Sequence, residues 1–347
     1  MNFTFYKLRQ KSINCNSLKL IFYQRHNLKF KKADIIIISY NTQKLTLECI
    51  SSIYKTANQI VNEIIVVDNF STDGSPDAIK NEFPKVKLIV NSKNLGYAKA
   101  VNIGISAASS EIFIISNSDV VFKENSIRIL IEYLISNPDI AVCGPRQLYP
   151  DSSYQYSYGD VPGLAFAIKK LFLINHLSEL INKKKWEKGI KQIKHVSYVD
   201  GAVMAINRKA FEEVDGFDED YFFYTEEADF CYRVKKNGWK VVHNPNSVIL
   251  HYRGATDINK GFSYDRLKEM VYTKILFCKK HLSFQKTKFY VISEIIYSVN
   301  MIFLWTIITI FRSSKNKDYI GKWKIKYNKL MLNIWLDELN QLLKNDE

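Results

Sequence analysis

The segments DIIIISY at 34–40 and EIIVVDN at 63–69 decide the fold, because each is a continuous apolar run that ends in polar side chains. Such runs are typical of strands buried on both faces, as in parallel sheets. Two similar runs follow, VKLIVN at 86–91 and EIFIISN at 111–117. Strand and helix alternating in this way predict a doubly wound, mostly parallel α/β layer. The helices are expected at about 44–57 and at about 76–83, and the loop SKNLGYAKAVNIG opens a further helical stretch.

Polar side chains gather where these predicted strands end. In doubly wound sheets, ligands bind beyond the carboxyl ends of the strands. The sequence therefore predicts a ligand site at that edge of the sheet. Its candidate residues are Ser39, Tyr40, Asn41, Asp68, Asn69, Asn117 and Asp119.

Length and composition bound the class of protein. The 347 residues suit one large domain with extensions, and 47% hydrophobic residues can build a substantial core. This composition excludes collagen-like, disordered and disulfide-scaffold proteins. The five cysteines are widely spaced and form no C-x-x-C pair, which favours a reducing compartment and argues against a zinc site.

The formal net charge of +14 is unevenly spread. Residues 1–32, 164–195 and 260–290 together carry +20, so the remainder is net negative. Basic stretches interleaved with apolar residues fit an anionic membrane surface, although any one of them could be an ordinary solvated face. No nucleic-acid-binding motif accompanies the charge, so we expect no nucleic-acid partner. The N-terminus lacks the apolar core of a signal peptide.

The second half of the chain is less regular. Residues 164–195 have helical apolar spacing and are expected to form a flap. The stretch 197–207 reads as one strand, and 239–251 as another that ends at His251. A short helix is expected at 225–237, with Thr225 as its N-cap and Gly238 just beyond its end.

A strongly apolar stretch covers 289–311. From Ile295 to Phe311 no residue is charged, which gives roughly 26 Å of helix at about 1.5 Å per residue. That length is the lower limit for crossing a bilayer. Because Glu294 and Asn300 weaken the case for a span, we expect an in-plane or packed helix, with a single span as the alternative.

A nucleotide-sugar enzyme has to hold a base, neutralise a diphosphate and deprotonate an acceptor hydroxyl. Asp68 or Asn69 can pair with the ring edge of a pyrimidine, and Tyr40 can stack on it. The alternative is that DNFSTDGS at 68–75 is an ordinary turn, since Asp and Asn favour turns through local hydrogen bonds.

The diphosphate calls for a hard divalent cation on carboxylate oxygen. Asp119 follows a buried strand, and His251 ends another and could join it. A turn-capping aspartate and a buried histidine are the respective alternatives. For the general base, the cluster Glu226-Glu227-Ala228-Asp229 opens a helix. Adjacent residues point about 100° apart, so at most one of the two glutamates can face the site directly.

The order of the motifs is more specific than any one of them. The chain resembles the family 2 glycosyltransferases of GT-A type, in particular the rhamnosyltransferase-like group of surface-polysaccharide biosynthesis. The resemblance covers about 33–285. Its elements are IIIISYN (35–41), EIIVVDNFSTDGS (63–75), NSKNLGYAKAVNIGI (91–105), ISNSD (115–119), DGAVMAINRKAF (200–211), GFDEDYFFYTEEADFCYRVKKNGW (216–239) and VILHYRGAT (248–256).

The resemblance implies roles for individual residues. Asp119 is similar to the last residue of the family's DXD metal motif, and His251 to the metal-associated histidine of its H-x-x-G element. Glu227 occupies the general-base position of the acid pair, beside Glu226. Donor-binding positions are implied for Asp68, Asn69, Asn94, Gly96 and Asn102. Two further donor-binding candidates come from their places at strand ends, Tyr40 as the stacking residue and Asn117.

Two departures from the family pattern affect these expectations. Asn117 stands where many members have Asp, which removes one negative charge from the metal motif and could weaken metal affinity. Glu227 stands where Asp is common, and its extra methylene could change acceptor geometry. Neither departure indicates an inactive enzyme.

Other enzymes also use this type of sheet. A dehydrogenase needs G-x-G-x-x-G after the first strand, whereas this chain reads SYNTQK there. A sugar nucleotidyltransferase usually has a glycine-rich loop with Lys or Arg at the same place, and this loop is also missing. A membrane scaffold or nucleic-acid binder would carry its basic residues on the folded core, which is net acidic here. The nucleotidyltransferase stays as the alternative function.

The sequence therefore predicts an inverting, metal-dependent glycosyltransferase. It would use Mg²⁺ or Mn²⁺ and transfer a sugar from dTDP-rhamnose or a UDP-sugar to a glycan or lipid-linked glycan. Its expected place is the inner face of the cell membrane, where it associates peripherally. The expected parts are a basic extension (1–32), a catalytic domain (33–285) and C-terminal helices (286–347). Within the domain, 33–120 would bind the nucleotide sugar and 121–285 the acceptor.

Overall fold

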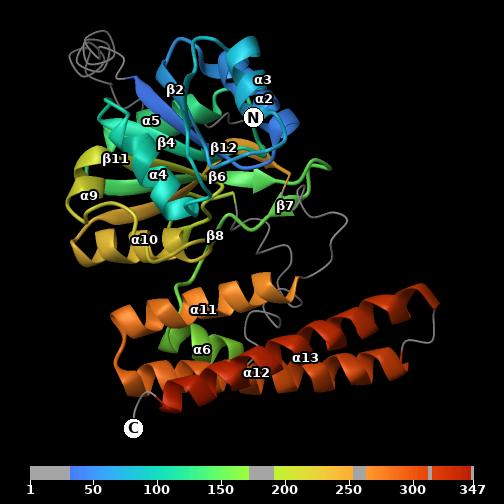
Figure 1. Ribbon diagram of the computed structural model, residues 1–347. Helices are drawn as coiled ribbons and strands as arrows, with labels where there is room; N and C mark the ends of the chain where they lie inside the picture. The colour runs from blue at the N-terminus through green and yellow to red at the C-terminus, as the bar shows by residue number, and fades with distance from the viewer. Residues whose placement is uncertain (1–31, 172–190, 253–262, 312–314, 345–347) are drawn as a thin grey trace, which may run out of the picture.

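The computed structural model describes residues 32–171, 191–252, 263–311 and 315–344, and the expected extension at 1–32 lies almost wholly outside them. Within these residues the main sheet has ten strands, and its central path runs β3-β2-β1-β4-β11-β6-β12-β5 (Figure 1). The first four strands of this path are parallel. They are β1 (Ala33–Ser39), β2 (Val61–Asp68), β3 (Lys87–Val90) and β4 (Ile112–Asn117).

The second half of the chain completes the sheet with mixed pairing. Strand β11 runs antiparallel to both β4 and β6, while β12 is parallel to β6 and antiparallel to β5. Short strands extend the rim, where β7 pairs with β6 and β9 with β12, while β10 and β8 form a separate two-stranded sheet. The strands are β5 (Val120–Phe122), β6 (Ile140–Leu148), β7 (Tyr154–Gln155), β8 (Tyr158–Gly159), β9 (Lys194–His195), β10 (Tyr198–Val199), β11 (Val203–Asn207) and β12 (Lys240–His251).

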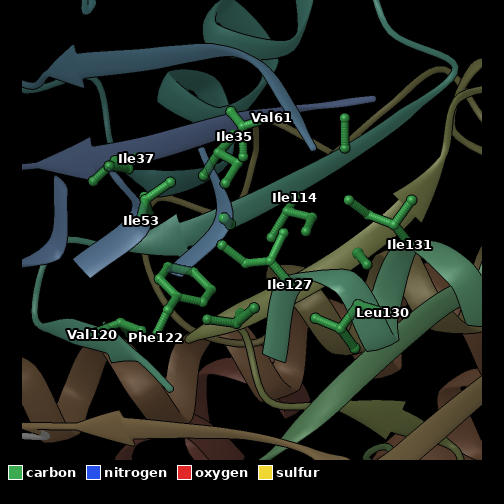
Figure 2. Packing of buried hydrophobic residues seen from close by; sticks show 14 of the residues in the cluster. Ile35, Ile37, Ile53, Val61, Ile114, Val120, Phe122, Ile127, Leu130 and Ile131 are labelled. Atoms are coloured by element: carbon green, nitrogen blue, oxygen red, sulfur yellow. The ribbon is translucent and has the colours of Figure 1, made fainter. Parts of the chain in front are cut away.

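Helices cover both faces of the sheet, as the alternating pattern predicts. Ile35 and Ile37 of β1 face a core that includes residues of α2, α3 and α5 (Figure 2). Ile36 and Ile38 point the other way and join a second core with α4, α9 and α10. The helices are α2 (Gln43–Ala57), α3 (Ser75–Glu82), α4 (Tyr97–Ser106), α5 (Ser126–Ser136), α9 (Arg208–Glu212) and α10 (Glu226–Lys236).

A third core lies in a separate layer of helices (Figure 1). Here α12 and α13 lie side by side, while α6 and α11 lie between this pair and the sheet. Because α6 and α11 precede residue 286, this core draws on both sides of the expected boundary, which stays a prediction. The elements are α6 (Leu164–Leu171), α11 (Tyr264–His281), α12 (Phe284–Phe311) and α13 (Lys315–Lys344). The expected flap lies mostly outside the described residues.

Two expectations from the sequence are wrong in detail. The single strand expected at 197–207 is two strands, because a turn at 200–202 separates β10 from β11. Helix α10 does begin after Thr225, and Gly238 follows it with φ +91°. The Thr225 side chain, however, makes no capping hydrogen bond, because the residue adopts φ +70° and its hydroxyl lies 3.2 Å from that of Thr273.

Candidate active site

Strand register brings the polar strand ends together. Ser39 pairs with Asp68 across β1 and β2, and Asn117 pairs with the neighbouring position of β1 on its other side. Antiparallel β11 begins beside the end of β4, and the Asn117 amide donates to the carbonyl of Ala202 at 2.9 Å. Residues from both halves of the chain therefore meet at the carboxyl edge of the parallel strands.

Asp68 has one satisfied and one unsatisfied oxygen. Its side chain is fully buried, and its Oδ1 accepts from the amide of Ser71 at 2.8 Å. Its Oδ2 is buried and has no partner among the residues that the structure describes. An unpaired buried acceptor costs about 1–3 kcal/mol, so a ligand N–H at this point would recover that energy. Tyr40 is 46% exposed at the end of the neighbouring strand, as a stacking surface requires.

The structure assigns Asn69 to loop positioning. Its amide nitrogen donates to Asn94 Oδ1 at 2.8 Å and to the Gly96 carbonyl at 3.1 Å. Its oxygen accepts from Asn91 Nδ2 at 3.1 Å and from the Leu95 amide at 3.0 Å. All four bonds go to the loop 91–96, so the Asn69 amide is already satisfied before any donor binds.

Gly96 and Asn102 hold a second loop against α4. Gly96 has φ +82°, and a Cβ there would lie 2.6 Å from the Phe222 carbonyl oxygen, so a side chain is excluded. Asn102 donates to the carbonyl of Phe217 at 2.8 Å and accepts from its amide at 3.0 Å. The loop at 216–225 therefore packs on α4. Gly96 and Asn102, which were expected to bind the donor, contact this loop, and the loop leads into the acid pair.

Asp119 and His251 lie together, as expected for two ligands of one ion. The Asp119 Oδ1 is 3.3 Å from His251 Nε2, because β12 pairs with β5 directly after the Asp119 turn. His251 Nδ1 faces the Oε1 atoms of Gln147 at 3.1 Å and Gln155 at 2.6 Å. The amide nitrogens of both glutamines donate elsewhere, to Asp200 and to the His251 carbonyl. Their oxygens therefore accept, and the histidine proton sits on Nδ1.

This tautomer suits a cation. His251 Nε2 then presents a lone pair to the Asp119 carboxylate, and two acceptors at this distance need a positive charge beside them. The described residues contain no group of three or more His, Cys, Asp and Glu side chains arranged around one point. Two ligands from the protein fit Mg²⁺ or Mn²⁺, since such ions complete their shells with water and substrate phosphate.

The acid pair begins α10 after strained backbone. Tyr224 and Thr225 both have positive φ, at +76° and +70°, which is costly for residues with a β-carbon. Glu226 is buried, and within the described part of the chain one of its oxygens has no partner. Burial, Glu227 and Asp200 together raise the pKa of Glu226 well above its usual range.

Glu227 lies against the turn between β10 and β11. A Cβ on Gly201 would be 3.6 Å from the Cβ of Glu227 and 3.9 Å from its carboxyl carbon. The Tyr97 hydroxyl donates to the Gly201 carbonyl at 3.0 Å. Burial raises the pKa of Tyr97, and so do four nearby carboxylates. In order of effect these are Glu226, Glu227, Asp200 and Asp119.

Sequence reasoning missed Tyr97, Gln147, Gln155 and Asp200. No sequence signal marks the glutamines, which lie in β6 and β7, and only the fold shows that both contact His251. Asp229 turns away from the site, as the helical spacing predicted. It is fully buried and bonds to Arg233 at 2.6 Å and to His281 at 2.6 Å, which ties α10 to α11.

Comparison with known proteins identifies the family. The model of glycosyl transferase family 2 matches residues 34–215. The chain belongs to this family. The match covers four predicted strands and their polar ends, so the expected family and GT-A type of fold are confirmed.

Several relatives are sugar transferases. The chain is 30% identical over 206 residues to N-acetylglucosaminyl-diphospho-decaprenol L-rhamnosyltransferase of Mycobacterium tuberculosis, covering 55% of this chain and 66% of that protein. It is 30% identical over 183 residues to glycosyltransferase GlyG of Streptococcus pneumoniae, covering 52% and 58%. It is 27% identical over 226 residues to dTDP-rhamnosyl transferase RfbF of Shigella flexneri, covering 64% and 70%. The chain thus spans less than two thirds of the first two relatives.

One solved structure supports the fold. Mannosyltransferase PcManGT from Pyrobaculum calidifontis, in complex with GDP-Man and Mn²⁺, superposes with a TM-score of 0.53. The superposition covers 89% of this family 2 chain and 93% of that one, at 13% sequence identity. At this identity the likeness shows a shared fold and nothing further. The comparisons give no support to the alternative of a sugar nucleotidyltransferase.

Proposed function

We propose that this family 2 protein is an inverting glycosyltransferase that uses a nucleoside-diphosphate sugar and a divalent cation. The single observation that carries the proposal is the meeting of three groups at one sheet edge. These are a buried carboxylate with a free acceptor at Asp68, the Asp119–His251 pair, and the carboxylates of the acid pair. Base binding, diphosphate neutralisation and proton removal each need one of them.

The donor would bind with its base at Asp68 and Tyr40. The unpaired Asp68 Oδ2 accepts the ring N–H of a pyrimidine, and the exposed tyrosine ring stacks on the base. Asn69, Asn94 and Gly96 keep the adjoining loop in one conformation through the bonds described above. This arrangement lowers the ordering cost of binding, because the loop is fixed in advance.

Asp119 and His251 would hold the Mg²⁺ or Mn²⁺ ion. Once bound, the ion supplies charge stabilisation to the departing diphosphate. Gln147 and Gln155 keep the histidine in the tautomer whose Nε2 can act as a ligand. Asn117 stands two residues before Asp119 and faces the same edge through its backbone bond to Ala202.

Glu226 and Glu227 have different roles in the removal of the acceptor proton. Glu226 keeps its proton over a wider pH range, because its pKa is raised by burial and by Glu227. Glu227 is less buried and lies against the Gly201 turn, so it takes the role of general base. It removes the proton of the acceptor hydroxyl as that oxygen attacks the anomeric carbon, from the face opposite to the leaving diphosphate. One displacement of this kind inverts the anomeric configuration.

The relatives guide the choice of substrates. Two of them are named rhamnosyltransferases, and one name includes a diphospho-decaprenol acceptor. We therefore place dTDP-rhamnose first among donors, followed by UDP-sugars, and a lipid-linked glycan first among acceptors. A lipid-linked acceptor places the protein at the inner face of the cell membrane, in peripheral association.

The deciding experiment measures transfer directly. Purified protein is incubated with Mn²⁺, a panel of nucleotide sugars and a diphospholipid-linked N-acetylglucosamine. The product is identified by mass spectrometry, and its anomeric configuration by NMR. We expect one donor to give a product of inverted configuration. Retained configuration would refute the mechanism, and synthesis of a nucleotide sugar from a sugar phosphate would establish the alternative function.

A further inference from the structure

Helix α12 is apolar on two opposite sides. One side is buried: Tyr290 and Val291 belong to the third core, and Met301 is also buried. The opposite side is exposed to solvent, at positions spaced by three and four residues or their multiples, as on one helix face. The exposed residues are Phe289, Ile292, Ile296, Val299, Phe303 and Ile310, with exposed fractions from 37% at Ile292 to 71% at Ile310. We call these six residues the α12 stripe.

The α12 stripe has basic neighbours on its helix only at its start, where Lys286 and Lys288 precede Phe289. Between Phe289 and Ile310 the only charged residue is Glu294. Its side chain is 2% exposed and pairs with Lys170 of α6 at 2.6 Å. Two-stranded coiled coils in water usually flank their apolar seam with charged residues along its length, whereas α12 has no charged residue after Glu294. The stripe is therefore a better match for lipid than for a second helix in water.

The packing of helix α12 argues against its crossing the membrane. Residues Phe284–Ile310 reach a mean hydropathy of 1.8, which by length and composition is enough to cross a bilayer. Helix α12, however, packs along α13 and against α6. To cross the membrane, it would have to draw the Lys170–Glu294 pair and the lysines of α13 into hydrocarbon. Such burial is unfavourable, whereas a helix lying in the interface leaves the pair inside the protein and the exposed lysines in water.

The neighbouring part of α13 is basic. Residues 322–329 contain four lysines and no acid, and the side chains of Lys322, Lys326 and Lys329 are exposed. Gly321 of α13 lies against Thr309 of α12, where a Cβ would be 2.0 Å from the threonine hydroxyl. The basic segment therefore lies beside the end of α12, where the stripe is most exposed. Trp323, 37% exposed, adds a side chain typical of membrane interfaces.

We propose that the α12 stripe lies flat on an anionic bilayer, with the lysines of 322–329 contacting lipid phosphate. The helices α12 and α13 form the layer farthest from the sheet, so this face meets the membrane before the active site does (Figure 1). The inference deepens the proposed function, since it names the surface that brings the enzyme to a lipid-linked acceptor. Its test does not depend on transfer.

The first experiment uses the full chain and vesicle flotation. We compare vesicles of phosphatidylcholine alone with vesicles containing about 30% phosphatidylglycerol. We expect binding to the anionic vesicles and little to the neutral ones. Val299→Glu with Phe303→Glu should reduce the partition coefficient at least about tenfold, because two apolar side chains leave the acyl boundary. The matched control is Val90→Glu, since Val90 is 50% exposed on β3 and Val299 is 48% exposed.

The second experiment tests the lysines. Replacing Lys322, Lys326 and Lys329 with Gln should weaken anionic binding by roughly a hundredfold, at about fivefold for each lysine. Added salt should reduce wild-type binding and affect this variant less. The control replaces three exposed lysines of the other half, Lys55, Lys80 and Lys85. Equal loss in both triple variants would overturn the proposal, because binding would then follow net charge alone.

Two outcomes would assign the stripe to something else. If wild type is a dimer by sedimentation and Val299→Glu makes it a monomer without changing vesicle binding, the stripe is a subunit interface. If alkaline carbonate fails to extract the bound protein, α12 crosses the bilayer. Either result overturns the proposal. Donor binding by thermal shift is measured on every variant, so loss of vesicle binding with intact donor binding separates this inference from the proposed function.

Discussion

The half proposed to bind the donor (the donor half) and the half proposed to bind the acceptor (the acceptor half) each contain a buried carboxylate. In both, one oxygen is unpaired among the described residues, but the surroundings differ. Asp68 lies among amides, and its other oxygen accepts a backbone hydrogen. Glu226 lies among carboxylates and follows two residues with strained backbone. The donor half is thus arranged to receive a hydrogen-bond donor without moving. The acceptor half concentrates negative charge, which a cation and a departing proton would relieve.

The largest expected effect comes from removing Asp119, whose pairing with His251 joins the two halves. Asp119→Ala removes the carboxylate of the metal pair, and several kcal/mol of charge stabilisation correspond to about a thousandfold or more in kcat. Stabilisation of donor binding by Mn²⁺ should disappear as well. Steady-state kinetics and thermal shift measure both. Asp77→Ala, on the exposed side of α3, is the matched control, and normal turnover of Asp119→Ala would refute the metal assignment.

Next in size is the loss of the general base. Glu227→Gln keeps the shape and removes the basic oxygen, so single-turnover rates should fall about 100- to 10,000-fold. The Kd of the donor should stay nearly constant, because other residues hold the nucleobase and the metal ion. Glu226→Gln should have a smaller effect on rate. The reverse pattern would exchange the two roles, and unchanged rates in both variants would place the base elsewhere.

Substitutions of Gln147 should have a smaller effect on activity. They are informative because this side chain contacts both His251 of the metal pair and Asp200 beside the acid pair. It accepts from His251 and donates to Asp200 at 3.1 Å. Gln147→Leu should lower Mn²⁺ affinity about 10- to 100-fold, measured by titration of the donor complex. Gln147→Glu keeps the acceptor for His251 and loses the donor to Asp200. It should therefore retain more metal affinity than Gln147→Leu. Gln59→Leu, at an exposed position, should change nothing.

The smallest effect concerns stability and pH. The raised pKa of Glu226 means that the folded protein binds this proton more tightly than the unfolded chain. Stability from Glu226 is thus complete below its unfolded pKa, near 4.5, and is lost as the pH rises through the folded pKa. Glu226→Gln removes this dependence. Its Tm should exceed that of wild type at pH 8, and the difference should shrink towards pH 4.5. A constant difference would contradict the assignment.

The fold could be read largely from the sequence, because strand and helix periodicity are local properties. The run at 34–40 became β1, and the helix expected at 225–237 became α10 with nearly the same ends. The turn at 200–202 escaped prediction although Asp200-Gly201 is a turn dipeptide, because the apolar residues on both sides of it read together as one strand. The Thr225 cap failed because a contact with Thr273, 48 residues away, determines where its hydroxyl points.

By itself, the sequence determined which residues stand at strand ends, and therefore placed Asp68, Asn117 and Asp119 at one edge of the sheet. Only the tertiary structure decided how each polar group is used. The Asn69 side-chain amide hydrogen-bonds to the loop 91–96, and Gln147 joins His251 to Asp200. The physical reason is that strand position follows from local hydrophobic pattern, whereas a hydrogen-bond partner depends on segments that meet only after folding.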